Sequence, residues 1–330
     1  MTFLFLGMDG MDHELADHFG VTHADDDHPV HLKRLEQDMP EHLADEPGER
    51  RDVGWWTFYL WGAIAAGRID TPHMEIEHPS PDDLKYPDKE GYFAWDAVDG
   101  DVRVVNWPIS LPEYQEDCGY FRGDRISTDY DQLEPFLLLM EINKAIERNY
   151  DAVFAATRIV DTHQHAATEP GNYNAQGYDH FAEGFTGHGF EELHEIMVDA
   201  TEWAADPDAE QPAEAVEARE SIIDAVLNWL EGVYTQADDI IKGVNWEGVE
   251  DHVIVSDHGF DRLGAGDVKS HGPAAVISSS LGEWENMSEF IPGWRGEALE
   301  RIEAHDPGET VEVDQEEEIQ RRLRELGYRV

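Results

Sequence analysis

The chain has 330 residues, of which 73 are Asp or Glu and only 23 are Lys or Arg, so its formal net charge is −50. A surface with so many negative charges repels nucleic acid and anionic lipid, which excludes nucleic-acid-binding and membrane-surface proteins in ordinary buffer. With 41% hydrophobic and 10% aromatic residues the chain is not disordered over most of its length, and we expect a halophilic protein whose acidic surface is screened by molar salt.

The cysteine content and the hydropathy of the chain limit the cellular compartments in which we expect the protein. The single Cys118 excludes an intrachain disulfide and a cysteine-based zinc site. The amino terminus lacks the basic region of a secretory signal, and no apolar run approaches the length of a membrane span. We therefore expect a cytoplasmic protein in a high-salt cytosol, with neither a membrane nor a nucleic-acid partner. The composition leaves its oligomeric state open.

Short apolar runs alternate with helical patterns along the chain. Strands are predicted for residues 2–8, 102–106, 151–158, 252–256 and 274–278. Helices are predicted for residues 32–39, 55–66, 134–149, 221–244 and 316–326. This alternation is typical of an α/β protein, here a three-layer α/β/α sandwich with a mostly parallel central sheet. We expect a single domain over residues 1–330, with an inserted lid-like segment at about 166–220.

Six acidic or histidine residues stand at the ends of these predicted strands or close to them. They are Asp9, Asp161, His165, Asp257, His258 and His271. Open α/β sheets bind their ligands outside the carboxyl ends of the strands, so these side chains are expected to converge. Carboxylates together with neutral imidazoles are the ligand set of zinc, manganese or iron. The pattern therefore predicts a two-metal hydrolase site.

Several of these residues also have a simpler structural explanation. Asp9 could cap a helix that follows the first strand. Asp257 and His258 could cap a turn, although a buried acid beside a histidine is unfavourable without a cation. His271 stands in the string SHG, which could be a turn. His163, in the string VDTHQH, is expected to be a surface histidine.

Six strings of residues together resemble the alkaline phosphatase superfamily, in particular its type I phosphodiesterase and nucleotide pyrophosphatase branch. They are LGMDGMD, HPVHLKRLEQDM, VVNWPISLPEY, VDTHQH, SDHGF and IQRRLRELGYRV, the last being similar to the tail of sulfatase-like members. The resemblance implies an alkaline phosphatase-like catalytic domain with two divalent metal ions, zinc first and manganese second. It implies that one ion is held by Asp9, Asp257 and His258, and the other by Asp161, His165 and His271.

The chain departs from that family at the nucleophile. Family members attack with Thr or Ser at the start of a helix, or with a cysteine-derived formylglycine, whereas the corresponding string here is RRDVGWWTFYLWGAIAAG. Aligning Trp56 with the family's tryptophan places Asp52 at the nucleophile position, and Thr57 is the nearest hydroxyl. Three interpretations stay open: Asp52 as a metal ligand with metal-bound hydroxide as nucleophile, Thr57 as nucleophile, or loss of covalent catalysis.

The leading functional prediction is metal-dependent hydrolysis of a small-molecule phosphate ester, by in-line attack at phosphorus between two metals. A diester or a nucleotide-like group is favoured over a monoester. The alternatives are a non-catalytic metal-binding member that has lost its nucleophile, or a sulfatase-like hydrolase. The chain contains no Cys-x-Pro-x-Arg string, which argues against formylglycine chemistry.

Overall fold

Six strands form one sheet in the order β2-β6-β5-β1-β4-β3. The computed structural model describes residues 1–21, 28–38, 57–69, 91–108, 134–168, 213–260 and 272–304. The strands are β1 (Thr2–Met8), β2 (Lys33–Glu36), β3 (Val102–Val105), β4 (Ala152–Thr157), β5 (Val249–Val255) and β6 (Ala274–Ser279). β1, β3, β4 and β5 are parallel, whereas β6 pairs antiparallel with β5, and β2 antiparallel with β6. The prediction of a mostly parallel sheet is therefore confirmed.

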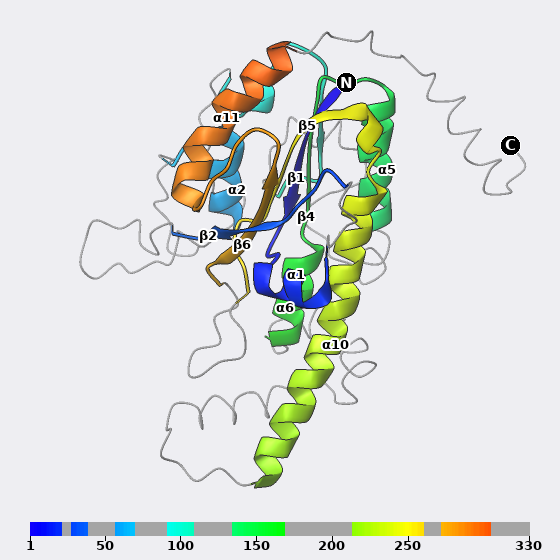
Figure 1. Ribbon diagram of the computed structural model, residues 1–330, viewed down its shortest axis with the longest axis vertical. Helices are drawn as coiled ribbons and strands as arrows, with labels where there is room; N and C mark the ends of the chain where they lie inside the picture. The colour runs from blue at the N-terminus through cyan, green and yellow to red at the C-terminus, as the bar shows by residue number, and fades with distance from the viewer. Residues whose placement is uncertain are drawn as a thin grey trace, which may run out of the picture.

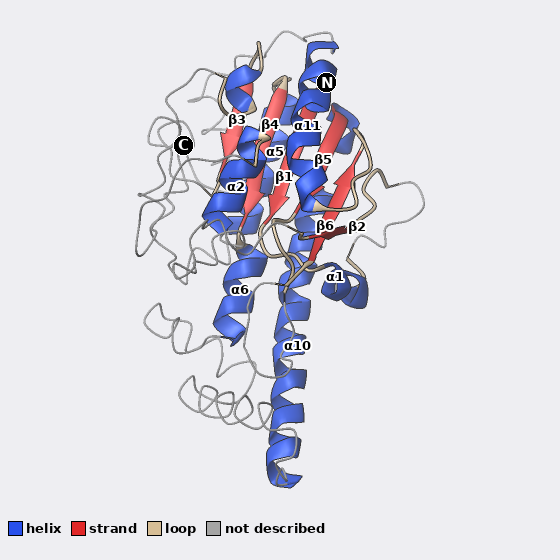
Figure 2. Ribbon diagram, turned by 90° about the vertical axis from the view of Figure 1, so that its left-hand side faces the viewer, coloured by secondary structure: helices blue, strands red, loops and turns tan. Residues whose placement is uncertain are grey.

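Helices cover both faces of this sheet. They are α1 (His13–Phe19), α2 (Thr57–Ala66), α5 (Glu134–Glu147), α6 (Ile159–Thr168), α10 (Ala213–Gly243) and α11 (Met287–Ala304), with two short 3-10 turns, η2 (Trp95–Ala97) and η4 (Trp246–Gly248). Figures 1 and 2 show α2 and α11 on one face and α5 and α10 on the other. The first half of α10 extends past the carboxyl edge of the sheet, where α6 also lies (Figure 2). This arrangement is the predicted α/β/α sandwich.

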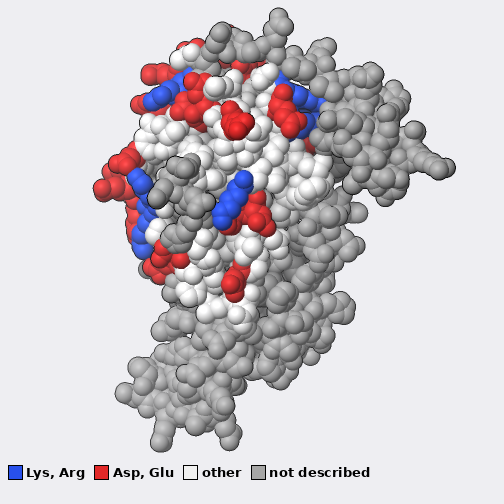
Figure 3. Space-filling view, turned by 45° about the vertical axis from the view of Figure 1, so that its right-hand side comes forward, with Lys and Arg blue, Asp and Glu red and all other residues white. Residues whose placement is uncertain are grey.

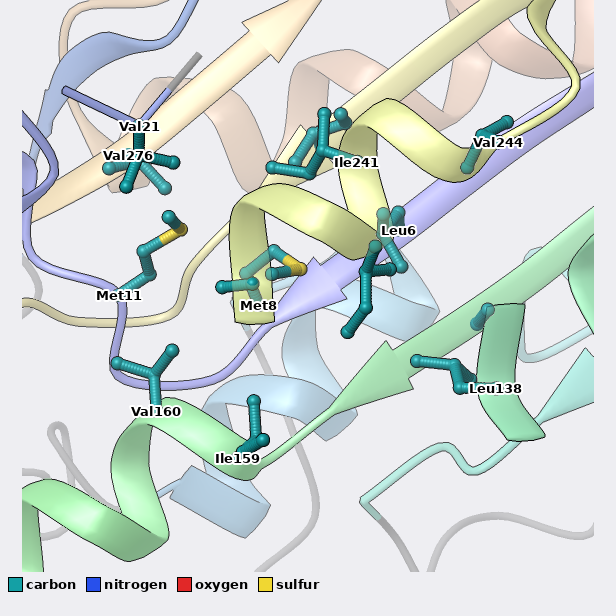
Figure 4. Packing of buried hydrophobic residues seen from close by; sticks show 14 of the residues in the cluster. Leu6, Met8, Met11, Val21, Leu138, Ile159, Val160, Ile241, Val244 and Val276 are labelled. Atoms are coloured by element: carbon teal, nitrogen blue, oxygen red, sulfur yellow. The ribbon is translucent and has the colours of Figure 1, made fainter. Parts of the chain in front are cut away.

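Burial on both faces explains why β1 is an unbroken apolar run. Leu6 and Met8 point toward α5 and α10, and Figure 4 shows them among Leu138, Ile241 and Val244. The alternate residues of β1 face the second core, which contains the buried aromatic side chains of α2, η2, α11 and their neighbours. Because successive side chains of a strand point to opposite faces, a central strand with helices on both sides needs apolar residues throughout.

Close packing of α2 on β1 sets the direction of that helix. A Cβ added to Gly7 would lie 2.4 Å from the Trp61 ring, so only glycine leaves room for this indole. One turn further along α2, the Ile64 carbonyl accepts a hydrogen bond from Trp294 Nε1, and the Trp294 ring lies 4.6 Å from that of Phe5. The helix therefore runs antiparallel to β1, and its amino end points toward the carboxyl edge of the sheet.

Several element predictions need correction. Residues 32–39 were predicted to be helical, but β2 lies there, with Leu35 buried and paired in register with Ala275 of β6. Pairing at the sheet edge overrides the local helical pattern. The helix predicted for residues 221–244 begins earlier, at Ala213, so part of the predicted insertion is helical.

The remaining differences concern what lies between and beyond these elements. Residues 169–212, most of the predicted insertion, and the helix predicted for residues 316–326 lie outside the described residues. Helices α1 and α11 were not predicted. No helix in the described ranges has the length and apolar character that crossing a bilayer requires.

Candidate metal centre

The carboxyl ends of three adjacent strands bring four of the predicted site residues together. Asp9 follows β1, Asp161 lies in the first turn of α6 directly after β4, and Asp257 and His258 follow β5. β1 lies between β4 and β5, so the three carboxyl ends meet at one edge of the sheet, which is where open α/β sheets bind ligands. All four side chains are buried, with at most 2% of any one exposed.

The imidazole of His258 stands at the centre of the three carboxylates. Its Nε2 lies 3.6 Å from Asp161 Oδ1, 3.6 Å from Asp257 Oδ2 and 3.8 Å from Asp9 Oδ1. Its Nδ1 lies 2.8 Å from the carbonyl oxygen of Gly259, which can only accept, so in the neutral ring the proton is on Nδ1. The lone pair of Nε2 then faces three carboxylates, and such an arrangement is stable only with a cation or a proton between them.

The acids show the same need for a positive charge. Within the described part of the chain, Asp9 Oδ1 and Asp257 Oδ2 are buried without a hydrogen-bond partner. Burial, followed by the charges of Asp257 and Asp161, holds the pKa of Asp9 well above its ordinary value. Burial likewise raises the pKa of Asp257 to about 7. Buried carboxylates that repel one another and lack donors are typical of a cation site.

Three of these residues meet the geometric requirement for holding one ion. One ligand atom each from Asp9, Asp161 and His258 can be chosen so that all lie within 4.8 Å of one another. Oxygen and imidazole nitrogen atoms bind zinc at about 2.0–2.2 Å, so a central ion could reach all three with small side-chain movements. The donor set and the buried oxygens therefore fit a divalent metal ion.

The backbone around Gly10 holds the acids in place. Gly10 has φ +70°, and its N–H donates a hydrogen bond to Asp257 Oδ1 at 3.2 Å. A Cβ on Gly10 would lie 2.8 Å from the Cα of Asp161, so both the left-handed conformation and the close approach require glycine. The Asp161 N–H in turn donates to the Asp9 carbonyl at 3.1 Å. These contacts connect the ends of β1, β4 and β5.

Sequence reasoning missed two polar residues beside the acids. Arg158 Nε lies 3.1 Å from Asp9 Oδ2, its Nη2 lies 3.5 Å from Asp161 Oδ2, and 30% of its side chain is exposed. Gln37 Nε2 donates to the Asp257 carbonyl at 2.6 Å. The available signal for Arg158 was a base directly after a buried strand in a chain with few bases. No local pattern marks Gln37, because β2 is far from β5 in the sequence.

The buried hydroxyl group of Tyr234 connects the surrounding helices through hydrogen bonds. Tyr234 of α10 accepts hydrogen bonds from the Asp12 N–H and from Gln164 Nε2 of α6, both at 2.9 Å. Asp12 caps α1 by accepting from the Leu15 N–H, and its other oxygen accepts from the Phe260 N–H. The helix cap after β1 is therefore Asp12, so the explanation of Asp9 as a cap is wrong.

The other predicted site residues are less fully described. His165 lies in α6 one turn after Asp161, and Thr57 is the first residue of α2, but neither side chain is described. Asp52 and His271 lie outside the described residues. The metal-ligand role of His165 and His271 and the catalytic roles of Asp52 and Thr57 therefore stay predictions.

His163 contradicts its prediction as a surface histidine. Its side chain is only 6% exposed, and burial lowers its pKa to about 4. The string VDTHQH folds into a helix packed against the body of the protein, whereas a loop was expected for its histidines. His163 is thus a buried neutral histidine.

Comparisons with known proteins do not identify a family. No family model and no curated protein matches the sequence. Among solved structures, the crystal structure of a "putative sulfatase" from Bacteroides thetaiotaomicron is similar, with 10% sequence identity and a TM-score of 0.40. The match covers 100% of this chain and 75% of that one. A likeness this distant does not carry chemistry from one protein to the other.

Proposed function

We propose that the protein is a metal-dependent hydrolase of phosphoric esters, of the kind found in the alkaline phosphatase superfamily, with a preference for diesters or nucleotide-like groups. One observation carries the proposal: Asp9, Asp161, Asp257 and His258 converge at the carboxyl edge of a mostly parallel sheet, and one buried oxygen each of Asp9 and Asp257 has no donor in the described part of the chain. In an ordinary protein core, buried polar groups are hydrogen-bonded, and on an ordinary surface acids are in contact with water. Neither situation produces this arrangement.

The four described residues would hold a divalent ion, with zinc the first choice and manganese the second. When bound, such an ion would polarise a phosphoryl oxygen and lower the pKa of water at the site. The resemblance implies a second ion held by Asp161, His165 and His271, so Asp161 would stand between the two ions. Because the acids are almost completely buried, water has little access to them, which favours a strong field at a bound phosphoryl group.

The nucleophile would come from the amino end of α2 or from water. The N–H groups of the first turn of α2 are directed toward the carboxyl edge, where a helix dipole favours negative charge. Thr57 stands at that end, and Asp52 precedes it in the sequence. Either residue could supply or orient the attacking oxygen, in line with the leaving group.

A hydrolysis assay tests the proposal directly. Bis-p-nitrophenyl phosphate, p-nitrophenyl phosphate and p-nitrophenyl sulfate are offered to the full chain with Zn²⁺ or Mn²⁺, in about 2 M KCl to screen the acidic surface. Acidic side chains are spread over the described surface in Figure 3, which is why low salt is avoided. We expect metal-dependent cleavage, fastest for the diester and lost in Asp257→Asn.

The other outcomes separate the alternatives. Cleavage of the sulfate ester alone would replace phosphate with sulfate as the substrate class. Binding of metal without cleavage of any of the three esters would favour the non-catalytic member. Failure of the folded wild-type protein to bind either metal would overturn the proposal.

A further inference from the structure

Arg158 is the one positively charged side chain that the structure places against the acids of the candidate metal centre, among the described residues. It is the residue directly after β4 and directly before α6, so the backbone holds it at the carboxyl edge. Its Nε and Nη2 lie against Asp9 Oδ2 and Asp161 Oδ2, at 3.1 and 3.5 Å. The oxygens that face His258 Nε2 are the opposite ones, Asp9 Oδ1 and Asp161 Oδ1. The two carboxylates therefore lie between Arg158 and the centre of the site.

The charges of the site balance when Arg158 is included. The three carboxylates of Asp9, Asp161 and Asp257 carry three negative charges when ionised, and neutral His258 adds none. Arg158 together with one divalent ion supplies three positive charges. The guanidinium thus neutralises part of the acids' charge whether or not a metal ion is bound, because arginine does not lose its proton in proteins.

Exposure distinguishes Arg158 from the acids that it contacts. Its side chain is 30% exposed, whereas those of Asp9 and Asp161 are 0% and 2% exposed. Part of the Arg158 side chain is therefore open to a solute that reaches the carboxyl edge. A planar guanidinium presents five N–H donors, a geometry that matches phosphate oxygens and suits Arg for phosphate binding.

We propose that Arg158 is the anion-binding residue of this site: it holds the outer oxygens of Asp9 and Asp161 and binds the phosphoryl group of the substrate. The inference rests on the proposed function, because it assumes a phosphate-type substrate beside a bound metal ion. It predicts unequal effects of one substitution on two ligands. Removing Arg158 weakens anion binding directly, whereas metal affinity changes by the balance of two opposing effects, because a repelling charge is lost together with a partner that holds two metal ligands.

Calorimetry on the full chain in about 2 M KCl measures the affinities for the two ligands separately. Zn²⁺ or Mn²⁺ is titrated first, and inorganic phosphate is then titrated into the metal-loaded protein. For Arg158→Gln we expect phosphate affinity to fall about 10- to 100-fold, the loss of one charged hydrogen-bonding partner. Metal affinity should fall by less than phosphate affinity, or not at all. Arg158→Lys keeps the charge and should retain more phosphate affinity than Arg158→Gln. It also provides a test if Arg158→Gln does not fold.

Arg103→Gln is the matched control. Arg103 also contacts a carboxylate at 3.1 Å, that of Glu141, but this pair joins β3 to α5 away from the metal centre. Its substitution should change neither affinity. Phosphate affinity of Arg158→Gln equal to that of the wild type would overturn the inference, as would an equal loss of metal and phosphate affinity, which indicates a structural role. A folded wild type that binds no metal would overturn the proposed function itself, and with it this inference.

Discussion

Strand β5 carries the same dipeptide, Asp-His, near its start and just after its end, but the two pairs have opposite surroundings. Both pairs are buried, with no more than 6% of any of the four residues exposed. At the first pair, Ser280 Oγ donates to Asp251 Oδ1 at 2.8 Å, and His252 Nε2 lies 3.3 Å from Ser278 Oγ. At the second pair, Asp257 Oδ2 has no hydrogen-bond partner among the described residues.

The difference follows from the direction of the neighbouring strand. β6 runs antiparallel to β5, so the end of β6 and the residue after it bring hydroxyl groups to the start of β5. The carboxyl end of β5 faces the ends of β1 and β4 instead, which add two more acids. A buried polar pair whose side chains find protein partners is part of the structure, whereas a pair that faces two further buried acids calls for an external cation.

The largest expected difference between the two pairs is in activity. Asp257→Asn should lower kcat/KM for bis-p-nitrophenyl phosphate by at least about 100-fold, because changes to groups that merely support a metal ligand already cost 10- to 100-fold. Asp251→Asn should stay close to the wild type. Steady-state kinetics with saturating metal measures both. Equal losses in the two variants would mean that the second pair has no special role.

Metal addition should stabilise the protein through the second pair alone. Zn²⁺ or Mn²⁺ at about 100 times its dissociation constant should add about 3 kcal/mol to the free energy of unfolding, because the ion binds only the folded chain. Thermal melts with and without a chelator measure this gain. The gain should vanish in Asp257→Asn and persist in Asp251→Asn; its persistence in both would place the ion elsewhere.

Acid should destabilise the protein through His252 of the first pair. Burial lowers the pKa of His252 to about 4, whereas an unfolded histidine titrates near 6.5. Between these values the unfolded chain binds the extra proton, so the stabilising contribution is complete above about pH 6.5 and is lost as the pH falls toward 4, about 3 kcal/mol in all. His252→Gln lacks this group, so its unfolding free energy should fall less over the same range.

Denaturant titrations of both proteins at several pH values provide the comparison, and the difference between them removes the contribution of the other acids. Parallel pH dependences of wild type and His252→Gln would contradict the prediction.

The smallest expected effect concerns a hydroxyl at the first pair. Ser280→Ala removes the hydrogen bond to Asp251 Oδ1 and the acceptor of the His252 N–H, and should cost about 1–2 kcal/mol of unfolding free energy. Hydrolysis and metal affinity should not change, because Ser280 lies at the opposite end of β5. A loss of activity larger than the loss of stability explains would show that the two ends are coupled.

The central strands were predictable because their surroundings are uniform. A strand covered by helices on both faces carries apolar residues throughout, so β1, β4 and β5 appear in the sequence as short apolar runs. The acids that end these runs were predicted to converge for the same reason, since parallel strands end at one edge. Asp9, Asp161 and Asp257 do lie together there.

Predictions failed where a neighbour distant in the sequence decides the outcome. Leu35 lies in a charged string with a helical pattern, but its backbone pairs with β6 and forms a strand. His163 was predicted to be a surface residue because a Gly-, Asn- and His-rich stretch, typical of a loop, follows it in the sequence. Nothing in that stretch indicates that His163 lies in a buried helix. Arg158 was not considered at all, since nothing in the local sequence shows that Asp9 lies beside it.

The sequence by itself therefore determined the layers of the fold and which acids stand at one edge. Buried strands appear in it as apolar runs, and the acids follow the carboxyl ends of those runs. The tertiary structure alone decided which Asp-His pair is satisfied and which is not, and which base faces the acids. Those properties depend on the strands beside β5 and on the residue that follows β4, and contacts between segments that are separate in the sequence leave no pattern in either segment alone.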